Sequence, residues 1–313
     1  MKAVLNSIEL TDLNRQDLSF AIPSFAPHLG LCDSLRCCGI LQPPWIRAKA
    51  DGTKIIVDGF KRLEWAFQES FERIRVLLFA AECDPVKLLL DRIEAKLFGP
   101  ALNVAEKAQI VSKLVQNVAP EVMQSRYLPR LGIAAHPEAI RKWCRLAASD
   151  EHLLAAAALE EISDRTALEL VDWEKEAQRE IISLLKELRC SFSIQSEILE
   201  RVREIALREE SSELQVLNVP ELAAIKDDKN RNHREKTQAL RDWLYRRRYP
   251  RIKAREERFM RDLAASDLPA RVRITPPPAF EGQNWQLQLF FGNPGELVQM
   301  LGDLQVFAGS AEL

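Results

Sequence analysis

The chain has 313 residues, enough for two or three domains, and 47 % of them are hydrophobic, so it can bury a sizeable core. Its formal net charge of −2 excludes a protein that coats nucleic acid through bulk positive charge. No apolar run approaches the ~18 residues that cross a bilayer, and the first twenty residues lack the apolar core of a signal peptide. We therefore expect a cytoplasmic protein without a membrane segment.

The cysteines and histidines show no metal-binding pattern. The cysteines stand at positions 32, 37, 38, 83, 144 and 190, without C-x-x-C spacing, and the histidines are scattered at 28, 136, 152 and 233. Adjacent Cys37 and Cys38 cannot easily bridge each other. We expect reduced, buried thiols and no metal site.

The first hundred residues mix strand and helix patterns. β-branched and alternating runs predict strands at 45–49, 53–59 and 73–80. Apolar residues at helical spacing predict helices at 60–70 and 85–98. We therefore expect an α+β domain over residues 1–100.

The strand at 53–59 passes into the next helix through the corner Asp58-Gly59. Backbone N–H groups at a helix start, with a cation beside them, can hold an anion, and Lys61 and Arg62 follow at once. Upstream, Gln42 and the prolines after it set an extended start for a strand. The alternative is a tight turn that needs glycine, with Lys61 and Arg62 solvated on the outer face.

Residues 101–215 read as a helical domain in which β signals disappear. Helical patterns follow one another at 103–118, 120–131, 136–149, 150–163, 164–173, 174–188 and 193–209. The helix at 120–131, the corner at Leu131-Gly132 and a second helix opening with Pro137 have helix-turn-helix spacing.

The second helix of this pair carries a basic face. We expect Ile140, Cys144 and Ala147 to point inward. The residues expected to contact DNA, at guanine edges or phosphates, are His136, Arg141, Lys142 and Arg145. The alternative is an ordinary helical hairpin with an exposed basic face, and Glu138 at the helix start would repel phosphate.

Residues 216–265 read as a basic helical connector. Between positions 225 and 261 there are 14 Lys and Arg residues against 6 Asp and Glu residues. Arg246, Arg247 and Arg248 lie among Trp243, Tyr245 and Tyr249, a mixture that favours a nucleic-acid backbone or an acidic partner. The alternative is a solvated helix that packs its aromatic stripe on a neighbour.

The end of the chain, 266–313, reads as a small strand-strand-helix module. Strands are predicted at 270–278 and 284–292, a Pro-rich loop between them, and a helix at 293–307. Trp285, Leu287, Leu289 and Phe291 alternate on one strand face, and a two-stranded sheet with one helix has too little core to be stable alone. We expect a homodimer through this module; packing onto its own chain is the alternative.

Three motifs resemble the ParB family of bacterial partition proteins. GILQPPWI at 39–46 is similar to the family's Gly-x-x-Gln-Pro box, VDGFKRLEWA at 57–66 to its nucleotide-binding Gly-x-Arg-Arg box, and LNVAEKA at 102–108 to its Leu-Asn-Pro-x-Glu-x-Ala. The corner Leu131-Gly132 resembles the family's DNA-reading unit, and the C-terminal module resembles the family's dimerisation module.

The resemblance implies a ParB/sulfiredoxin-like first domain, a helix-turn-helix middle and a nucleoid-associated protein that binds DNA. Its role would be chromosome or plasmid partition, or transcriptional regulation, with a homodimer and a partition ATPase as partners. It also implies CTP with magnesium as cofactor. The nucleotide-binding positions are Gln42, Asp58, Gly59, Lys61 and Arg62.

The chain departs from the family pattern at the nucleotide site. Glu64 stands where a third arginine would fall, and Asp91-Arg92 with Lys96 stands where CTP-binding members carry Glu-Asn-x-x-Arg. These departures argue against hydrolysis, so we expect no enzyme activity. The alternatives are a CTP-hydrolysing DNA clamp and a protein-interaction adaptor. Sulfiredoxin chemistry needs a cysteine beside the phosphate loop, and residues 58–66 contain none.

Overall fold

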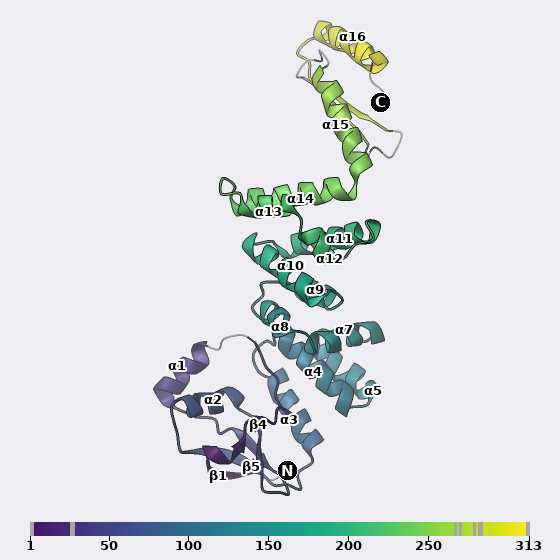
Figure 1. Ribbon diagram of the computed structural model, residues 1–313. Coiled ribbons are helices and arrows are strands. Elements are labelled where there is room, and N and C mark those ends of the chain that lie inside the picture. The colour runs from purple at the N-terminus through teal and green to yellow at the C-terminus, as the bar shows by residue number, and fades with distance from the viewer. Residues whose placement is uncertain are drawn as a thin grey trace. The chain divides into compact units, whose positions relative to one another are not determined.

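The structure is a computed structural model that describes residues 3–25, 29–265, 268, 271–277, 280 and 284–310. The chain divides into two compact units, Met1–Ser196 and Glu197–Leu313. It contains both helices and a sheet, so the predicted α+β class is confirmed (Figure 1). The finer domain boundaries at 100, 215 and 265 stay predictions.

The described part of the first unit contains one five-stranded mixed sheet with the strand order β1-β5-β3-β4-β2. The strands are β1 Ala3–Glu9, β2 Leu13–Asn14, β3 Trp45–Ala48, β4 Lys54–Asp58 and β5 Arg73–Phe79. β1 and β5 pair antiparallel, as do β3 and β4, whereas β3 with β5 and β2 with β4 are parallel. The sequence patterns predicted β3, β4 and β5; β1 and β2 were not predicted.

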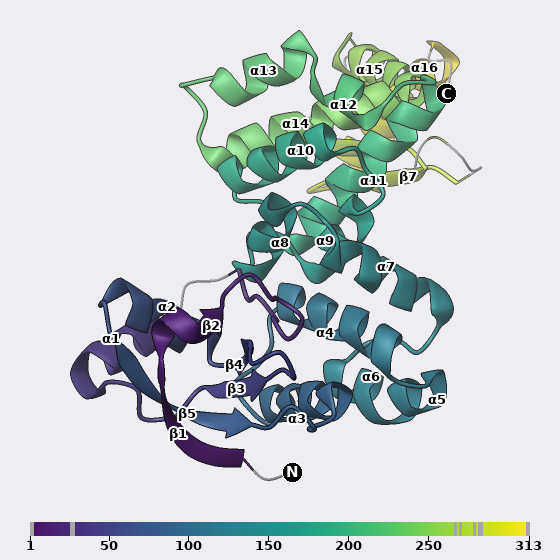
Figure 2. The same ribbon diagram turned by 60° about the horizontal axis from the view of Figure 1, so that its bottom comes forward.

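Helices cover both faces of this sheet. On one face α2, Phe60–Gln68, buries Leu63 and Ala66 against Ile46 and Ile56. Ile55 and Val57 alternate with Ile56, so they point to the opposite face. There α3, Pro85–Leu97, packs against β4 (Figures 1 and 2). The corner between β4 and α2 is therefore anchored on both sides by buried apolar residues.

The helical segments of the first unit beyond α2 and α3 follow the predicted pattern closely, except α1, which was not predicted. They are α1 Leu29–Cys38, α4 Val104–Asn117, α5 Pro120–Val122, η2 Met123–Tyr127, α6 Leu128–Leu131, α7 Pro137–Ala147, α8 Glu151–Ala158, α9 Asp164–Leu170 and α10 Lys175–Glu187. The predicted helix at 120–131 contains a π-helical turn, η2. The ring of Pro129 lacks the N–H that would bond to the carbonyl of Ser125, which favours an irregular turn here.

The second unit is helical and ends in a small sheet. Helix α11, Phe192–Arg208, begins in the first unit and continues into the second. The other elements are α12 Glu213–Leu217, α13 Pro220–Asp227, α14 His233–Arg248, α15 Pro250–Ala265, β6 Val272–Thr275, β7 Gln286–Leu289 and α16 Pro294–Ser310. β6 and β7 pair antiparallel. The start of the first predicted strand, at 270, and much of the loop before the second, at 278–279 and 281–283, lie outside the described residues.

The described cysteines are free thiols, but the expectation that they are buried is wrong for five positions. Cys190 is buried, Cys83 and Cys144 are half-buried, and Cys32, Cys37 and Cys38 are exposed on α1. In helix α1, Leu35 is buried and Leu31 is half-buried, whereas the other described side chains from Gly30 to Cys38 are exposed. No described helix is long and apolar enough to cross a membrane.

Candidate nucleotide pocket and nucleic-acid interface

The corner between β4 and α2 brings two of the sequence motifs into contact. Gly59 caps α2 with φ 87°, a left-handed conformation that favours glycine. A Cβ atom on Gly59 would lie 2.9 Å from the Cβ of Pro44. The position therefore needs glycine for its backbone angle and also for the close approach of the Gln42–Pro44 segment.

Arg62 joins the two motifs through its guanidinium. Its Nη1 donates to the backbone carbonyl of Gln42 at 2.5 Å, and its Nη2 donates to Asp58 Oδ2 at 2.8 Å. The side chain is only 15 % exposed. The alternative of a solvated Arg62 is therefore wrong. Gln42 contributes its carbonyl to this contact, and the residue itself is exposed.

Lys61 is also held in place. Its Nζ donates to the hydroxyl of Ser24 at 2.7 Å, across 37 positions of sequence. Burial lowers the pKa of Lys61 below its ordinary value, because partial removal from water disfavours the charged amine. Lys61 is half-buried beside the start of α2, so the alternative of a solvated Lys61 is wrong.

Arg92, on α3, completes the charged end of the site and was seen in the sequence only as a departure from the family motif. Its Nε lies 3.3 Å from Asp58 Oδ1, and its guanidinium lies over the Phe60 ring at 4.9 Å. The side chain is 5 % exposed, and burial lowers its pKa to about 10. Neither Nε nor Nη1 has a hydrogen-bond partner. The sequence signal was the pair Arg92 and Lys96, one helical turn apart.

These residues line a pocket of about 590 Å³. Its charged residues are Lys61, Arg62, Arg92 and Lys96 against Asp58, Glu64, Glu106 and Glu151. The formal charges of the pocket sum to zero, so an anion is attracted only where the cations are closer to it than the acids are. Apolar wall residues include Leu18, Ile22, Phe25 and Phe60. A ligand with an anionic end and a flat apolar end fits this division.

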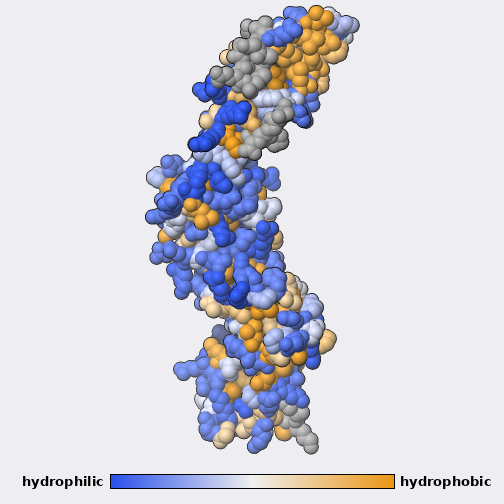
Figure 3. All heavy atoms as spheres, turned by 90° about the vertical axis from the view of Figure 1, so that its right-hand side faces the viewer, coloured by the Kyte–Doolittle hydropathy of each residue, from blue (hydrophilic) through white to orange (hydrophobic). Residues whose placement is uncertain are grey.

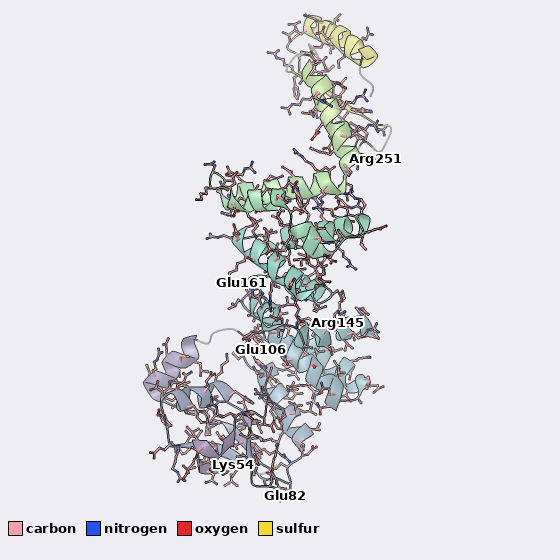
Figure 4. The ribbon with its side chains drawn as sticks, viewed as in Figure 1. Lys54, Glu82, Glu106, Arg145, Glu161 and Arg251 are labelled. Atoms are coloured by element: carbon pink, nitrogen blue, oxygen red, sulfur yellow. The ribbon has the colours of Figure 1, made fainter. Side chains whose placement is uncertain are left out.

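The two less exposed carboxylates of the pocket, Asp58 and Glu106, do not suit a protein-held magnesium ion, and the other two, Glu64 and Glu151, are exposed. Asp58 is engaged by Arg62 and Arg92. Glu106, labelled in Figure 4, accepts from Lys96 Nζ at 2.6 Å and from the Asn103 N–H at 3.3 Å. No group of three or more acidic, histidine or cysteine side chains among the described residues could hold a metal ion. The residues present therefore do not fit the magnesium that the family resemblance implies.

The helix–corner–helix predicted at 120–147 is present. Gly132 ends α6 in a left-handed conformation, φ 69°, and its N–H bonds to the carbonyl of Pro129 at 3.2 Å. His136 caps α7 by accepting the Ala139 N–H on its Nδ1 at 3.1 Å. His136 thus has a structural role at the start of the candidate reading helix.

The inward face of α7 differs by about one residue from the prediction. Trp143 and Leu146 are the buried side chains of α7, whereas Ile140, Cys144 and Ala147 are half-buried along one flank. The largest side chain of α7, Trp143, therefore lies on its inward face. Arg141 and Arg145 stay exposed, and Lys142 is half-buried.

Each predicted DNA-binding cation of α7 has an acidic neighbour in the chain. Arg141 lies 2.5 Å from Glu138. Arg145, labelled in Figure 4, pairs with Asp172 and donates to the carbonyl of Val171 at 2.9 Å. Lys142 lies 3.8 Å from Asp172. To contact a phosphate, Arg145 must therefore release Asp172.

Two of the three arginines predicted in the basic connector hold helices together within the second unit. Arg247 pairs with Glu209 at 2.6 Å, and Arg248 of α14 pairs with Glu204 of α11 at 2.7 Å. In return, Arg208 donates to the carbonyl of Arg248 at 2.7 Å. Arg246 is exposed and makes no ion pair with the described residues.

No protein-family model and no curated protein sequence matches the chain. Two solved structures that match are C-terminally truncated chromosome-partitioning protein ParB from Caulobacter crescentus. One is complexed to the centromeric parS site: the identity is 20 %, the match covers 57 % of this chain and 91 % of that one, and the TM-score is 0.31. The other is complexed with CTP-gamma-S: the identity is again 20 %, the coverage 58 % and 97 %, and the TM-score 0.26.

Both structures belong to the family that the sequence motifs resemble. At 20 % identity and these TM-scores, a functional assignment depends on the residues of this chain itself.

Proposed function

We propose that this chain is a ParB-like, nucleotide-responsive DNA-binding protein that acts in chromosome or plasmid partition, or in transcriptional regulation, on the nucleoid in the cytoplasm. The observation that carries the proposal is the contact of Arg62 with both Gln42 and Asp58. It joins two motifs, 20 positions apart, at the edge of one pocket.

The proposed ligand of this pocket is a nucleotide. Its phosphates approach the N-terminus of α2 at Gly59, where Lys61 and Arg62 supply charge, and its base lies on the apolar wall around Phe60. Calorimetric titration with CTP, ATP and GTP tests this. Absence of heat and of any thermal shift at millimolar nucleotide would leave the corner as a turn only.

The proposed DNA-reading element is α7. Its exposed arginines, Arg141 and Arg145, lie one turn apart beyond the Gly132 corner, with Lys142 beside them and His136 at the helix start. Replacing both arginines with alanine should cost about 1–3 kcal/mol of binding free energy for each base that an arginine reads. Unchanged affinity together with an unchanged salt slope would rule this helix out as the reader.

The experiment that tests the proposal as a whole is recovery of fragmented genomic DNA on the full chain at two salt concentrations. Enrichment of particular fragments that survives the higher salt supports a sequence-specific reader. Recovery of all fragments alike at low salt indicates backbone contacts alone, for which Arg246, Arg247 and Arg248 are the candidates. A homodimer through the C-terminal module and a partition ATPase are the further partners in this proposal.

A second candidate function is a protein-interaction adaptor without DNA reading. The observation that favours it is the pairing of Arg145 with Asp172 and of Arg141 with Glu138, which neutralises the basic face of α7. Failure to recover any DNA at either salt concentration would favour the adaptor. A CTP-hydrolysing clamp is the enzyme alternative, and release of phosphate from CTP in the presence of DNA would establish it.

A further inference from the structure

Arg92 is the residue of the pocket whose bonding is least complete. Its guanidinium is buried beside Asp58, yet Nε and Nη1 donate no hydrogen bond, although Nε lies 3.3 Å from Asp58 Oδ1. Two buried donor nitrogens without hydrogen-bond partners are costly, because they have lost their bonds to water without a replacement. Such a group is retained where a further partner completes its bonding.

Asp58 is the shared partner of two arginines. One of its oxygens accepts from Arg62 Nη2 at 2.8 Å, and the other faces Arg92. Arg62 belongs to the helix start at which an anion would bind, whereas Arg92 lies behind it on α3. If an anion draws Arg62 away, Asp58 stays neutralised by Arg92. The carboxylate then has a cation beside it in both states.

We propose that this pocket binds a nucleotide without a divalent metal ion, with Arg92 supplying the fixed positive charge at Asp58 that a metal ion would otherwise provide. The inference rests on the proposed function, because it concerns the ligand of the same pocket. A metal ion at a phosphate site needs a carboxylate that is free to bind it. Asp58 is occupied by guanidinium groups and Glu106 by Lys96. The other two carboxylates of the pocket, Glu64 and Glu151, are exposed, and no group of three acidic, histidine or cysteine side chains among the described residues could hold a metal ion.

The charge balance of the pocket bears on the affinity. Four cations face four acids, so a phosphate chain has to compete with Asp58 and Glu106 for their partners. Nucleotide affinity is therefore expected to be modest and to fall as salt rises. Magnesium in solution complexes the phosphates, so it should leave the affinity unchanged or reduce it.

The test is calorimetric titration of the full chain with CTP, once in excess magnesium and once in EDTA. The inference expects dissociation constants that agree within about threefold, or tighter binding in EDTA. Binding that appears only with magnesium overturns the inference and leaves the proposed nucleotide site standing. Absence of binding in both buffers overturns the site and the inference together.

A variant series isolates Arg92. Arg92→Gln should lose about tenfold or more of the affinity in EDTA, because a charged donor at the shared carboxylate is gone. Arg92→Lys keeps the charge and should lose less. The matched control is Arg73→Gln, an exposed arginine at the start of β5, which should bind as the parent does. A folded Arg92→Gln, judged by its melting curve, that keeps full affinity in EDTA overturns the role of Arg92.

Discussion

Gly59 is constrained at this site in two ways, by its backbone angle and by a close neighbour. Its left-handed backbone angle excludes most side chains, and Pro44 occupies the space that a Cβ atom would need. Gly52 has nearly the same angle, φ 85°, but nothing lies within 4 Å of its Cβ position. The two glycines separate the cost of the conformation from the cost of the close approach.

We expect Gly52→Ala to destabilise the chain by about 1–2 kcal/mol, the cost of a left-handed non-glycine residue. Gly59→Ala should cost about 1–3 kcal/mol more, since overpacking against Pro44 is added. Urea unfolding of both variants measures the difference. An equal loss in the two variants would mean that the Pro44 segment gives way at no cost.

Arg145 has a structural partner, so its role in DNA binding needs a paired test. Arg145→Ala and Asp172→Ala both remove the ion pair that joins α7 to the segment after α9. The arginine variant alone removes a candidate phosphate or base contact. We expect Arg145→Ala to weaken DNA binding and Asp172→Ala to preserve or strengthen it, measured by fluorescence anisotropy. If both variants weaken DNA binding equally, the ion pair supports binding by holding α7 in place, and Arg145 does not contact the DNA.

At the residue scale, the sequence predicted the corner but not its surroundings. The Asp58-Gly59 pair is a local signal, because a turn before a helix needs glycine. The bond from Arg62 to Gln42 spans 20 positions, and Ser24 reaches Lys61 across 37. Such contacts depend on how β3, β4 and α2 pack, which no local pattern encodes. Arg92 was missed as a site residue for the same reason.

At the scale of elements, the buried strand β4 and the capped helix α4 were predictable, whereas the mostly exposed strand β1 was not. β4 is buried at its three central residues, and α4 starts with a capping box of Asn103 and Glu106. β1 buries only Ile8 among its seven residues, so it lacks a hydrophobic alternation that could identify it. The inward face of α7 lies one position before the predicted face. Trp143 and Leu146 are buried there, whereas the predicted Cys144 and Ala147 are half-buried.

The ion pairs from α14 to Glu204 of α11 and to Glu209, the residue after α11, give the basic connector a second interpretation. Glu204 and Glu209 hold Arg248 and Arg247, and with these pairs formed the arginines are less available to phosphate. The pairs are partly exposed, so each is expected to add at most about 1 kcal/mol of stability.

Freeing these arginines is therefore a direct test of nucleic-acid contact by the connector. In Glu204→Gln with Glu209→Gln, affinity for non-specific duplex DNA should rise, and the salt slope should steepen by about one for each arginine that gains a phosphate. Glu200→Gln, an exposed acid of α11, is the control, since it changes charge without releasing an arginine. A gain in the double variant that is no more than twice the free-energy gain of the control would assign the effect to net charge, because the double variant removes two acids and the control one.

At the scale of the whole molecule, the C-terminal module is only partly covered by its own chain. Trp285 and Phe280 pack on Phe259 of α15, with ring centroids 5.3 and 5.9 Å from it. In these contacts the module packs on its own chain, as the alternative prediction proposed. Beyond this cluster, large apolar residues of the module stay exposed, and Figure 3 shows apolar surface on the part of the second unit that contains α16. They are Leu287, Phe290, Phe291, Val298 and Leu301.

A homodimer that buries these residues is the natural expectation for the proposed function, because two copies of α7 would match a palindromic site. Removal of everything after Ser266 would also strip Phe259 of its partners, so point variants test the dimer more cleanly. In Leu287→Lys with Val298→Lys, two side chains that are 49 % and 71 % exposed gain charge, and the dimer should dissociate while the fold persists.

The matched control for this dimer test is Leu207→Lys, which puts a charge on a 72 % exposed leucine of α11, outside the C-terminal module, and should leave the oligomeric state unchanged. Sedimentation at tens of micromolar distinguishes the states, and DNA affinity measured in parallel should lose its steep dependence on protein concentration only in the Leu287 and Val298 variant. A parent protein that sediments as a monomer, or a charged variant that stays dimeric, would place the self-association surface elsewhere or exclude it.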